Sequence, residues 1–404
     1  MGEEVALTGR WRPAWPVLGL ALLAGCATTP APQSPVSPSP TSGVAATQTP
    51  AVAPAIAGVA TLTQGHCHCA TLNLISQAGN EVGSVTLDPG AQPPIAGGTN
   101  GIYYLLGYQL MKLGTDGSVA TVGTVATAPT GSGASVGAPL EQGSLAMAPG
   151  ATEWGYVQSV SRAGTKTEQV WLGESSHPPR LLLSSVQSAG TTSAEFPNGW
   201  SYQLMGWADG SLVLAQIPSG ADSFASSALE VSRVNPQTGA ETLISNAPNC
   251  PISAVFGNAG YVCFQQGGGQ ATELVTGVAG ISTGAWSLPA GSGYGAASFD
   301  AADQQILFDD CSGCGASPSA ADLNSQMEVL DLATGSIQPV GAAGLVADGW
   351  LPDGQIVATQ YSQLSYARQG AAPLSEVVLV APTSGQVTAL TADPTSQFVG
   401  VATS

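Results

Sequence analysis

Positive charge is scarce in this sequence. Its 404 residues include 8 lysines and arginines against 26 aspartates and glutamates, which gives a formal net charge of −18. Nucleic acids and anionic lipid headgroups bind proteins through clustered Lys and Arg side chains. The composition therefore argues against a nucleic-acid partner and against adsorption to an anionic membrane surface.

The residues of common catalytic sites are scarce as well. The three histidines are His66, His68 and His177, and the sequence contains neither a His-Glu-x-x-His zinc motif nor a Gly-x-x-x-x-Gly-Lys phosphate loop. No set of acid, base and nucleophile stands out in the pattern. We therefore assign no residue a catalytic role from the sequence.

Long hydrophobic runs are missing too. A helix needs about 20 apolar residues to span a bilayer, whereas the run Trp15–Leu23 has about nine. It follows Arg10 and Arg12 and ends at Leu23-Ala24-Gly25-Cys26. Basic residues, a short apolar core and a small-residue processing site are the order of an export signal. An ordinary secretory signal is one interpretation of this block.

Residues 23–26 resemble the lipobox of bacterial lipoproteins. The resemblance implies that Cys26 is alkylated with a diacylglycerol, that the peptide bond before it is cut, and that the acylated cysteine becomes the N-terminus. Two or more acyl chains anchor a protein stably where one is marginal. We therefore expect residues 1–25 to be a signal peptide. The protein should be exported and lipid-anchored through Cys26 to the bilayer of the cell membrane or outer membrane.

The next segment has the composition of a tether. Residues 27–57 consist largely of Pro, Ala, Ser and Thr and carry no charge. Such a segment cannot bury enough apolar surface to offset its chain entropy. We predict a lipidated cysteine and a disordered tether over residues 26–58, followed by one folded domain over residues 59–404.

The folded domain is predicted to be all-β. Alternating apolar runs are broken by turn residues, and two kinds of hairpin interleave, each recurring about every 50 residues. The first kind has its turns at Asn100-Gly101, Pro149-Gly150, Asp209-Gly210, Asn258-Gly260, Ala302-Asp303, Asp353-Gly354 and Thr395-Ser396. The second kind has its turns near Asn80, Gly117, His177, Gly239, Gly280, Gly335 and Gly385.

A shared signature opens most hairpins of the second kind. It is a Glu or Gln followed by an apolar residue, at Gln109-Leu110, Gln169-Val170, Glu230-Val231, Glu273-Leu274, Glu328-Val329 and Glu376-Val377. Four strands per repeat at this period are typical of a β-propeller blade.

Residues 350–358, which contain Pro352-Asp353-Gly354, resemble the TolB-like, or WD40-like, propeller repeat. Residues 206–214 match it more weakly, and Val329-Leu330-Asp331-Leu332-Ala333-Thr334-Gly335 is similar to the outer hairpin of that family. The resemblance implies a propeller fold and carries no catalytic residue with it.

The repeats predict seven four-stranded blades, although six or eight remain possible. The first outer hairpin, Leu72–Leu87, has no complete inner hairpin before it, and the last inner hairpin, around 398–402, has no outer hairpin after it. We expect these N- and C-terminal strands to share one blade, because closure removes the free edge of an open ring.

Six cysteines follow Cys26, an even number in an exported chain where disulfides persist. Cys250 and Cys263 flank one inner hairpin, so a disulfide between them is our first expectation. Cys311 and Cys314 could close a small loop, and Cys67 and Cys69 are the remaining candidates.

The segment His66-Cys67-His68-Cys69 has the soft donors that zinc or copper prefers. On a strand only two of them would share a face, so a metal site would need further ligands, conceivably Cys311 and Cys314. We favour structural disulfides over metal. Asp309 and Asp310 could bind calcium, but adjacent acids in so acidic a chain are more often solvated.

Two functional classes follow from these observations. The first is a non-catalytic propeller that binds a protein, a peptide or an envelope glycan on one face of the ring. The second is a propeller hydrolase, lyase or metal-assisted lactonase, which would need at least three carboxylates or imidazoles converging at the channel mouth. Metal binding through residues 66–69 is a third possibility, since the fold alone does not choose among them.

Overall fold

The structure is a computed structural model that describes residues 54–64, 69–87, 93–125, 134–135, 144–162, 165–188, 200–218, 230–246, 250–256, 260–267, 270–289, 292–312, 325–361, 375–391 and 395–404. All of them belong to one compact unit, Val52–Ser404. The first strand begins at Ile56, slightly before residue 59. The described ranges contain strands and turns but no helix, and so none that could span a membrane.

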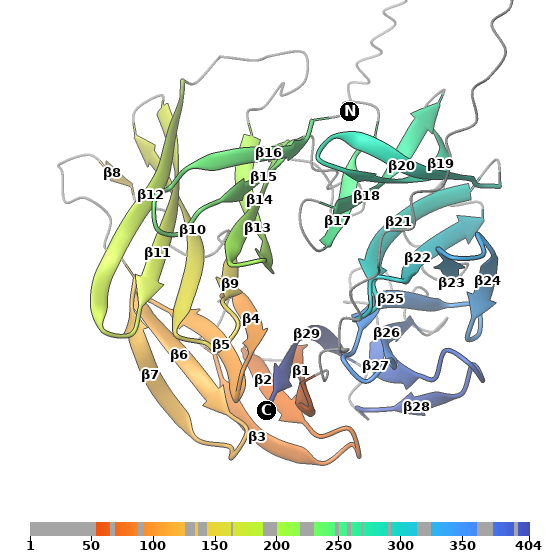
Figure 1. Ribbon diagram of the computed structural model, residues 1–404. Helices are drawn as coiled ribbons and strands as arrows, with labels where there is room; N and C mark the ends of the chain where they lie inside the picture. Colours follow the sequence, from red (N-terminus) through yellow and green to blue (C-terminus); the bar gives the residue numbers. More distant parts are fainter. Residues whose placement is uncertain are drawn as a thin grey trace, which may run out of the picture. The chain divides into compact units, whose positions relative to one another are not determined.

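The strands form seven antiparallel sheets that follow one another around a ring, a seven-bladed β-propeller (Figure 1). Blade 1, named from the innermost strand outward, consists of β29 (Ser396–Thr403), β1 (Ile56–Gln64), β2 (Ala70–Ile75) and β3 (Glu81–Thr86). Blade 2 consists of β4 (Ile95–Gly98), β5 (Gly101–Leu106), β6 (Gln109–Gly114) and β7 (Val119–Thr124). The seven blades expected from the repeats are confirmed.

In blade 3 two short segments share the innermost position beside one long strand. They are β8 (Ala134–Ser135) and β9 (Leu145–Met147), followed outward by β10 (Glu153–Arg162), β11 (Thr165–Glu174) and β12 (His177–Ser188). Blade 4 consists of β13 (Trp200–Ala208), β14 (Ser211–Pro218), β15 (Glu230–Val234) and β16 (Glu241–Ser245).

The remaining blades have the regular pattern of four consecutive strands. Blade 5 consists of β17 (Ile252–Phe256), β18 (Gly260–Gly267), β19 (Gln270–Val278) and β20 (Ile281–Ser287). Blade 6 consists of β21 (Ser292–Phe299), β22 (Gln305–Ser312), β23 (Ser325–Asp331) and β24 (Ile337–Val340). Blade 7 consists of β25 (Leu345–Trp350), β26 (Ile356–Tyr361), β27 (Ser375–Val380) and β28 (Val387–Ala389).

Most predicted hairpins are found, and one is wrong. Ser396 does not follow a turn into an inner hairpin, because it begins the single strand β29. The partner of β29 is β1, from the other end of the domain. Blade 1 therefore takes one strand from the C-terminal side and three from the N-terminal side. The sequence hid this because residues 56–62 are small and apolar and continue the composition of the tether.

Closure of the ring rests on β29, which is held from both sides. It pairs with β1 from Ile56↔Thr403 to Thr63↔Ser396. On the blade 2 side, the Asn100 N–H donates to the Thr403 carbonyl oxygen at 2.6 Å. A Cβ on Gly97 of β4 would lie 2.1 Å from the Val401 carbonyl oxygen, so only glycine allows β4 to approach β29 this closely.

The outer hairpin turns combine local turn chemistry with contact between blades. In blade 6 the Gly335 N–H donates to the Asp331 carbonyl oxygen and the Thr334 N–H to the Asp331 carboxylate, both at 2.8 Å. Gly335 has φ +71°, a left-handed conformation that glycine adopts without steric cost. A Cβ there would lie 3.1 Å from Trp286 Nε1 of blade 5. The turn glycine therefore also spaces the two blades.

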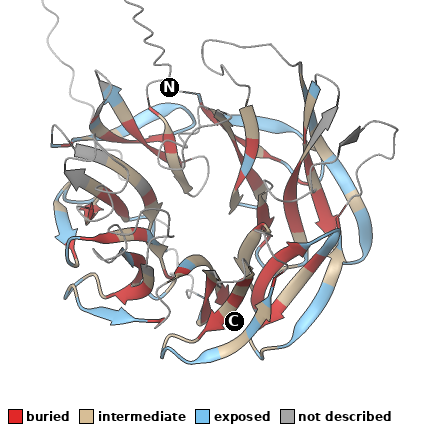
Figure 2. Ribbon diagram, turned by 180° about the vertical axis from the view of Figure 1, so that it is seen from behind, coloured by how far each residue is buried: buried red, intermediate tan, exposed pale blue. Residues whose placement is uncertain are grey.

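Apolar side chains are buried mainly between adjacent blades. One cluster joins Val262, Phe264 and Leu274 of blade 5 to Phe308 and Leu330 of blade 6. Figure 2 shows buried residues on the inner strands and exposed residues mainly along the outermost strands. Each blade therefore completes the core of its neighbours, which makes the ring cooperative.

The ring has two faces of different character. Because neighbouring strands are antiparallel, the turns after first strands and the turns after third strands lie on one face, which we call the turn face. The connections after second strands and between blades lie on the opposite face. The beginning of β1 at Ile56 and the end of β29 at Thr403 both lie on the turn face.

A methyl group at the closing contact should destabilise the ring. We expect Gly97→Ala to lower the free energy of unfolding by about 1–3 kcal/mol, because the new Cβ would overlap the backbone of β29. Gly107→Ala is the control, since no atom lies within 4 Å of its added Cβ and only a backbone cost of about 1–2 kcal/mol is expected. Urea unfolding of both variants measures the difference. A Gly97→Ala protein as stable as wild type would contradict this closing geometry.

Candidate functional site

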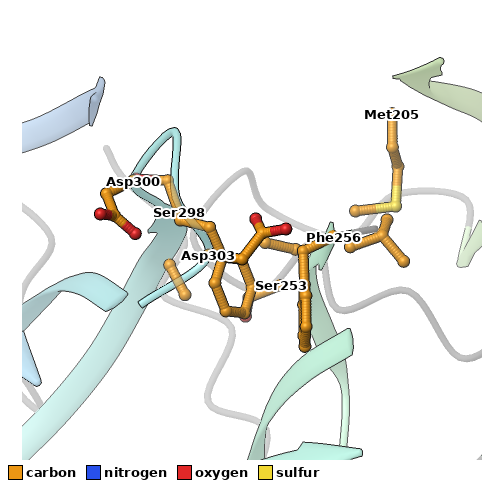
Figure 3. A pocket seen from close by; sticks show the side chains of 10 residues that line it. Met205, Ser253, Phe256, Ser298, Asp300 and Asp303 are labelled. Carbon is orange, nitrogen blue, oxygen red and sulfur yellow. The ribbon is translucent and has the colours of Figure 1, made fainter. Parts of the chain in front are cut away.

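A pocket opens on the turn face, where the first strands of blades 4, 5 and 6 come together (Figure 3). Its volume is about 400 Å³, within the range of about 300–1,000 Å³ typical of ligand sites. The residues that line it are Met205, Ser253, Ala254, Val255, Phe256, Ala297, Ser298, Phe299, Asp300 and Asp303.

Three lining residues lie at irregularities of the innermost strands. The pairing of β13 with β14 skips Met205, the pairing of β17 with β18 skips Ser253, and the pairing of β21 with β22 skips Ala297. Such bulges re-aim a side chain out of the regular alternation of a strand. The same irregularity recurs in blade 7, where Asp348 is skipped. The innermost strands of blades 4 to 7 therefore share an irregularity, but a different type of residue lies at it in different blades.

Aromatic rings form one wall of the pocket. The ring centroids of Phe256 in β17 and Phe299 in β21 are 4.1 Å apart, with a tilt of 39°. A Cβ on Gly260, which pairs with Phe256, would lie 2.6 Å from the Phe256 ring. The missing side chain of Gly260 therefore leaves the space that the Phe256 ring occupies.

Carboxylates stand at the mouth of the pocket, in the turn after β21. The Asp300 carboxylate accepts hydrogen bonds from the backbone N–H groups of Gln304 and Gln305, at 2.7 and 2.8 Å. Asp303 occupies the left-handed region with φ 53°, which aspartate tolerates better than most residues. Partial burial and the negative charges of Asp300 and Asp209 raise the pKa of the Asp303 carboxyl.

The third carboxylate of this region already has a cationic partner. Asp209, in the turn after β13, accepts from Arg233 at 3.2 Å between Oδ2 and a guanidinium nitrogen. The three carboxylates gather on the turn face, yet no three of the described His, Cys, Asp or Glu residues are close enough to hold a metal ion. The sequence predicted the turns at Asp209 and Asp303, but not that the two carboxylates influence each other or that Asp303 lines a pocket.

A disulfide ties the central strand of the pocket to its neighbour. The Sγ atoms of Cys250 and Cys263 are 2.05 Å apart, and the Cα atoms are 5.2 Å apart. This is the pair expected from the hairpin spacing. Both cysteines are buried, and the bond holds the start of β17, which supplies four consecutive lining residues from Ser253 to Phe256.

The other candidate cysteine and metal residues lie largely outside the described side chains. Cys69 is disulfide-bonded, and a sulfur in that state is not a thiolate ligand. Cys311 belongs to β22, but its side chain is not described. The candidates outside the described residues are Cys26, His66, Cys67, His68 and Cys314.

The adjacent acids Asp309 and Asp310 differ from the expectation of solvated side chains, because Asp309 is buried and Asp310 is half-buried. Asp309 is 3% exposed, and both of its oxygens accept from the Ala347 N–H of blade 7, at 3.0 and 3.2 Å. Glu168 of blade 3 likewise accepts from the Tyr202 N–H of blade 4 at 3.4 Å. These carboxylates are structural acceptors between blades, a role that only the neighbouring blade reveals.

Asp348, on the innermost strand β25, is a second carboxylate with a raised pKa. Its side chain is exposed, but the surrounding protein desolvates the carboxylate and raises its pKa to about 7. The Thr359 hydroxyl donates to Asp348 Oδ2 at 2.8 Å, which opposes the shift.

Two Gly-x-Ser-x-Gly segments occur in the chain, at residues 133–137 and 280–284. In hydrolases this motif places a nucleophilic serine at a sharp turn from a strand into a helix. Ser282 instead lies on the outermost strand β20, and Ser135 on the short strand β8. The described residues around Ser282 contain no helix, so residues 280–284 lack the context of a nucleophile elbow. The residues that follow Ser135 lie outside the described ranges.

No protein-family model matches this sequence, and no curated protein matches it. Among solved structures the chain is similar to a putative TolB from Agrobacterium tumefaciens, with 14% identity, coverage of 73% of this chain and 95% of that chain, and a TM-score of 0.41. It is 10% identical to an oligogalacturonate lyase from Vibrio parahaemolyticus, with coverage of 81% of this chain and 92% of that chain and a TM-score of 0.48. It is 8% identical to the WD40 domain of SCAP from fission yeast, with coverage of 84% of this chain and 87% of that chain and a TM-score of 0.40.

The structural neighbours include TolB and WD40 propellers, the families that the repeats resemble. At these identities and scores they carry no information about ligand or activity. The fold assignment rests on the seven sheets themselves.

Removing the disulfide should loosen the pocket strand. We expect Cys250→Ser with Cys263→Ser to lower the free energy of unfolding by roughly 3 kcal/mol, the chain-entropy value for a loop of this size; the two cysteines are 13 residues apart. Guanidinium unfolding without reductant measures the loss. Wild type with reductant should show a similar loss, and a wild-type protein with both thiols free would contradict the bond.

Proposed function

We propose that this protein is an exported, lipid-anchored binding protein whose propeller holds a protein or peptide ligand at the turn-face pocket. The observation that carries the proposal is the pocket itself. It combines a volume of about 400 Å³, an aromatic wall of Phe256 and Phe299, and carboxylates at its mouth. Ligand sites are usually concave and combine apolar surface with a few placed polar groups.

The chemistry of the lining favours binding over catalysis. The described residues that line the pocket offer carboxylates and serine hydroxyls but no imidazole, amine or guanidinium. Asp300 is engaged by two backbone N–H groups, which leaves Asp303 without a complementary acid or base in the lining. General acid–base catalysis needs positioned groups that can both donate and accept the proton.

The lipid anchor is proposed from the sequence. Cys26 ends a block with the order of an export signal, and the uncharged, proline-rich segment after it suits a spacer. Such a spacer could hold the propeller roughly 30–100 Å from the bilayer, depending on its stiffness.

The anchor is tested by changing the proposed acylation site. In cells that express the full chain, Cys26→Ser should move the protein from the detergent phase to the aqueous phase, because the sulfur that carries the diacylglycerol is absent. Detergent-phase partition followed by mass spectrometry of the N-terminal peptide is the measurement. A Cys26→Ser protein that stays in the detergent phase would overturn the anchor.

The binding function is tested by crosslinking from inside the pocket. A photoreactive benzoylphenylalanine in place of Met205, which lines the pocket, should give a discrete adduct with a protein or peptide in native membranes. The same residue in place of Val119, exposed on the outermost strand β7, is the control. An adduct with glycan alone, or equal labelling from both positions, would contradict the proposal.

A further inference from the structure

The turn-face pocket carries negative charge that no described cation neutralises. Asp300 and Asp303 both belong to the lining. The described Lys and Arg side chains make their contacts elsewhere and do not line the pocket: Lys112, Lys166, Arg180 and Arg233. Of the acids in this region, only Asp209 is paired with one of them.

Asp303 is the carboxylate most available to a ligand. It is exposed, and no described group donates a hydrogen bond to its carboxylate, in contrast to Asp300. Figure 3 shows it between Asp300 and Phe256. The surrounding protein partly desolvates the Asp303 carboxylate and the neighbouring acids repel its charge, and both effects raise its pKa. The positive charge of a bound cation would lower this pKa again.

The walls of the same pocket suit the rest of a long cationic side chain. The side chains of Phe256, Phe299 and Met205 line the pocket and offer apolar surface beside the acids. Lysine and arginine bury their methylene stems on apolar surface while the charged head stays polar. Ser298 Oγ, buried and unpartnered among described groups, adds an acceptor in the lining.

We propose that the turn-face pocket binds the ammonium or guanidinium group of a lysine or arginine side chain on a peptide ligand, with the stem against Phe256 and Phe299 and the charge at Asp303. The inference rests on the binding function proposed above and adds the chemistry of the ligand. A charged head explains the acids and an extended stem explains the aromatic wall, which a small inorganic cation would leave unused.

The methionine methyl group in the pocket gives a direct readout. In protein labelled with ¹³C at the methionine methyls, the Met205 signal, assigned with Met205→Leu, should shift when a short capped peptide with one central lysine or arginine is added at low salt. Replacing the lysine by norleucine, or the arginine by citrulline, should weaken binding at least about tenfold, because the shape remains and the charge is lost.

Protein variants test the same contact from the other side. Asp303→Asn should weaken binding of the lysine peptide by a similar factor. Asparagine also tolerates the left-handed backbone conformation of residue 303. Glu81→Gln, an exposed position at the start of β3, makes the same charge change elsewhere and should leave affinity unchanged. Binding to wild type should weaken as the pH falls through the raised pKa of Asp303, whereas Asp303→Asn should lack this step.

The outcomes distinguish the proposed cation site from the proposed binding function on which it rests. Equal affinity for the lysine and norleucine peptides, or full affinity in Asp303→Asn, would overturn the cation site even if the Met205 crosslink to a protein forms. A Met205 shift produced by a glucosamine oligosaccharide but not by the peptides would replace the peptide with a glycan. A missing crosslink together with a missing shift would reject both proposals.

Discussion

The pairing of β29 with β1 is the interaction on which the rest of the structure depends. It joins residues from opposite ends of the domain, from Ile56↔Thr403 to Thr63↔Ser396, and so converts a row of sheets into a ring. Without it, blade 1 would expose the inner edge of β1, and blade 2 would lose the backbone contact at Gly97. An unpaired edge of this kind invites association with other chains.

Once the ring is closed, side chains of one blade complete the hydrogen bonding of the next. The Ala347 N–H on the inner strand of blade 7 finds its acceptor in Asp309 of blade 6, and the Leu204 N–H of blade 4 finds one in Ser144 of blade 3, at 2.7 Å. Buried N–H groups left without acceptors are costly. Inner strands therefore depend on neighbours as well as on their own sheet.

The pocket inherits this dependence. Its lining comes from blades 4, 5 and 6, and each blade contributes a different kind of side chain. Met205 gives an apolar side, Phe256 an aromatic wall, and Asp303 a carboxylate. The disulfide between Cys250 and Cys263 holds the middle of the three strands. A binding site spread over three blades responds to any change in their spacing, which the packed interfaces between blades keep constant.

Local sequence determined a large part of this protein. Strand alternation, turn residues such as Gly335 and Asp331, and the repeat of about 50 residues predicted an all-β propeller of seven blades with a shared closing blade, because turns and pleats depend on neighbours in the chain. The spacing also singled out Cys250 and Cys263. Tertiary structure alone decided that β29 pairs with β1 rather than with a second C-terminal strand. It also decided that Asp309 is a buried acceptor, and that Asp300, Asp303 and Phe256 line one pocket. Each of these depends on residues far apart in the sequence, which only ring closure brings into contact.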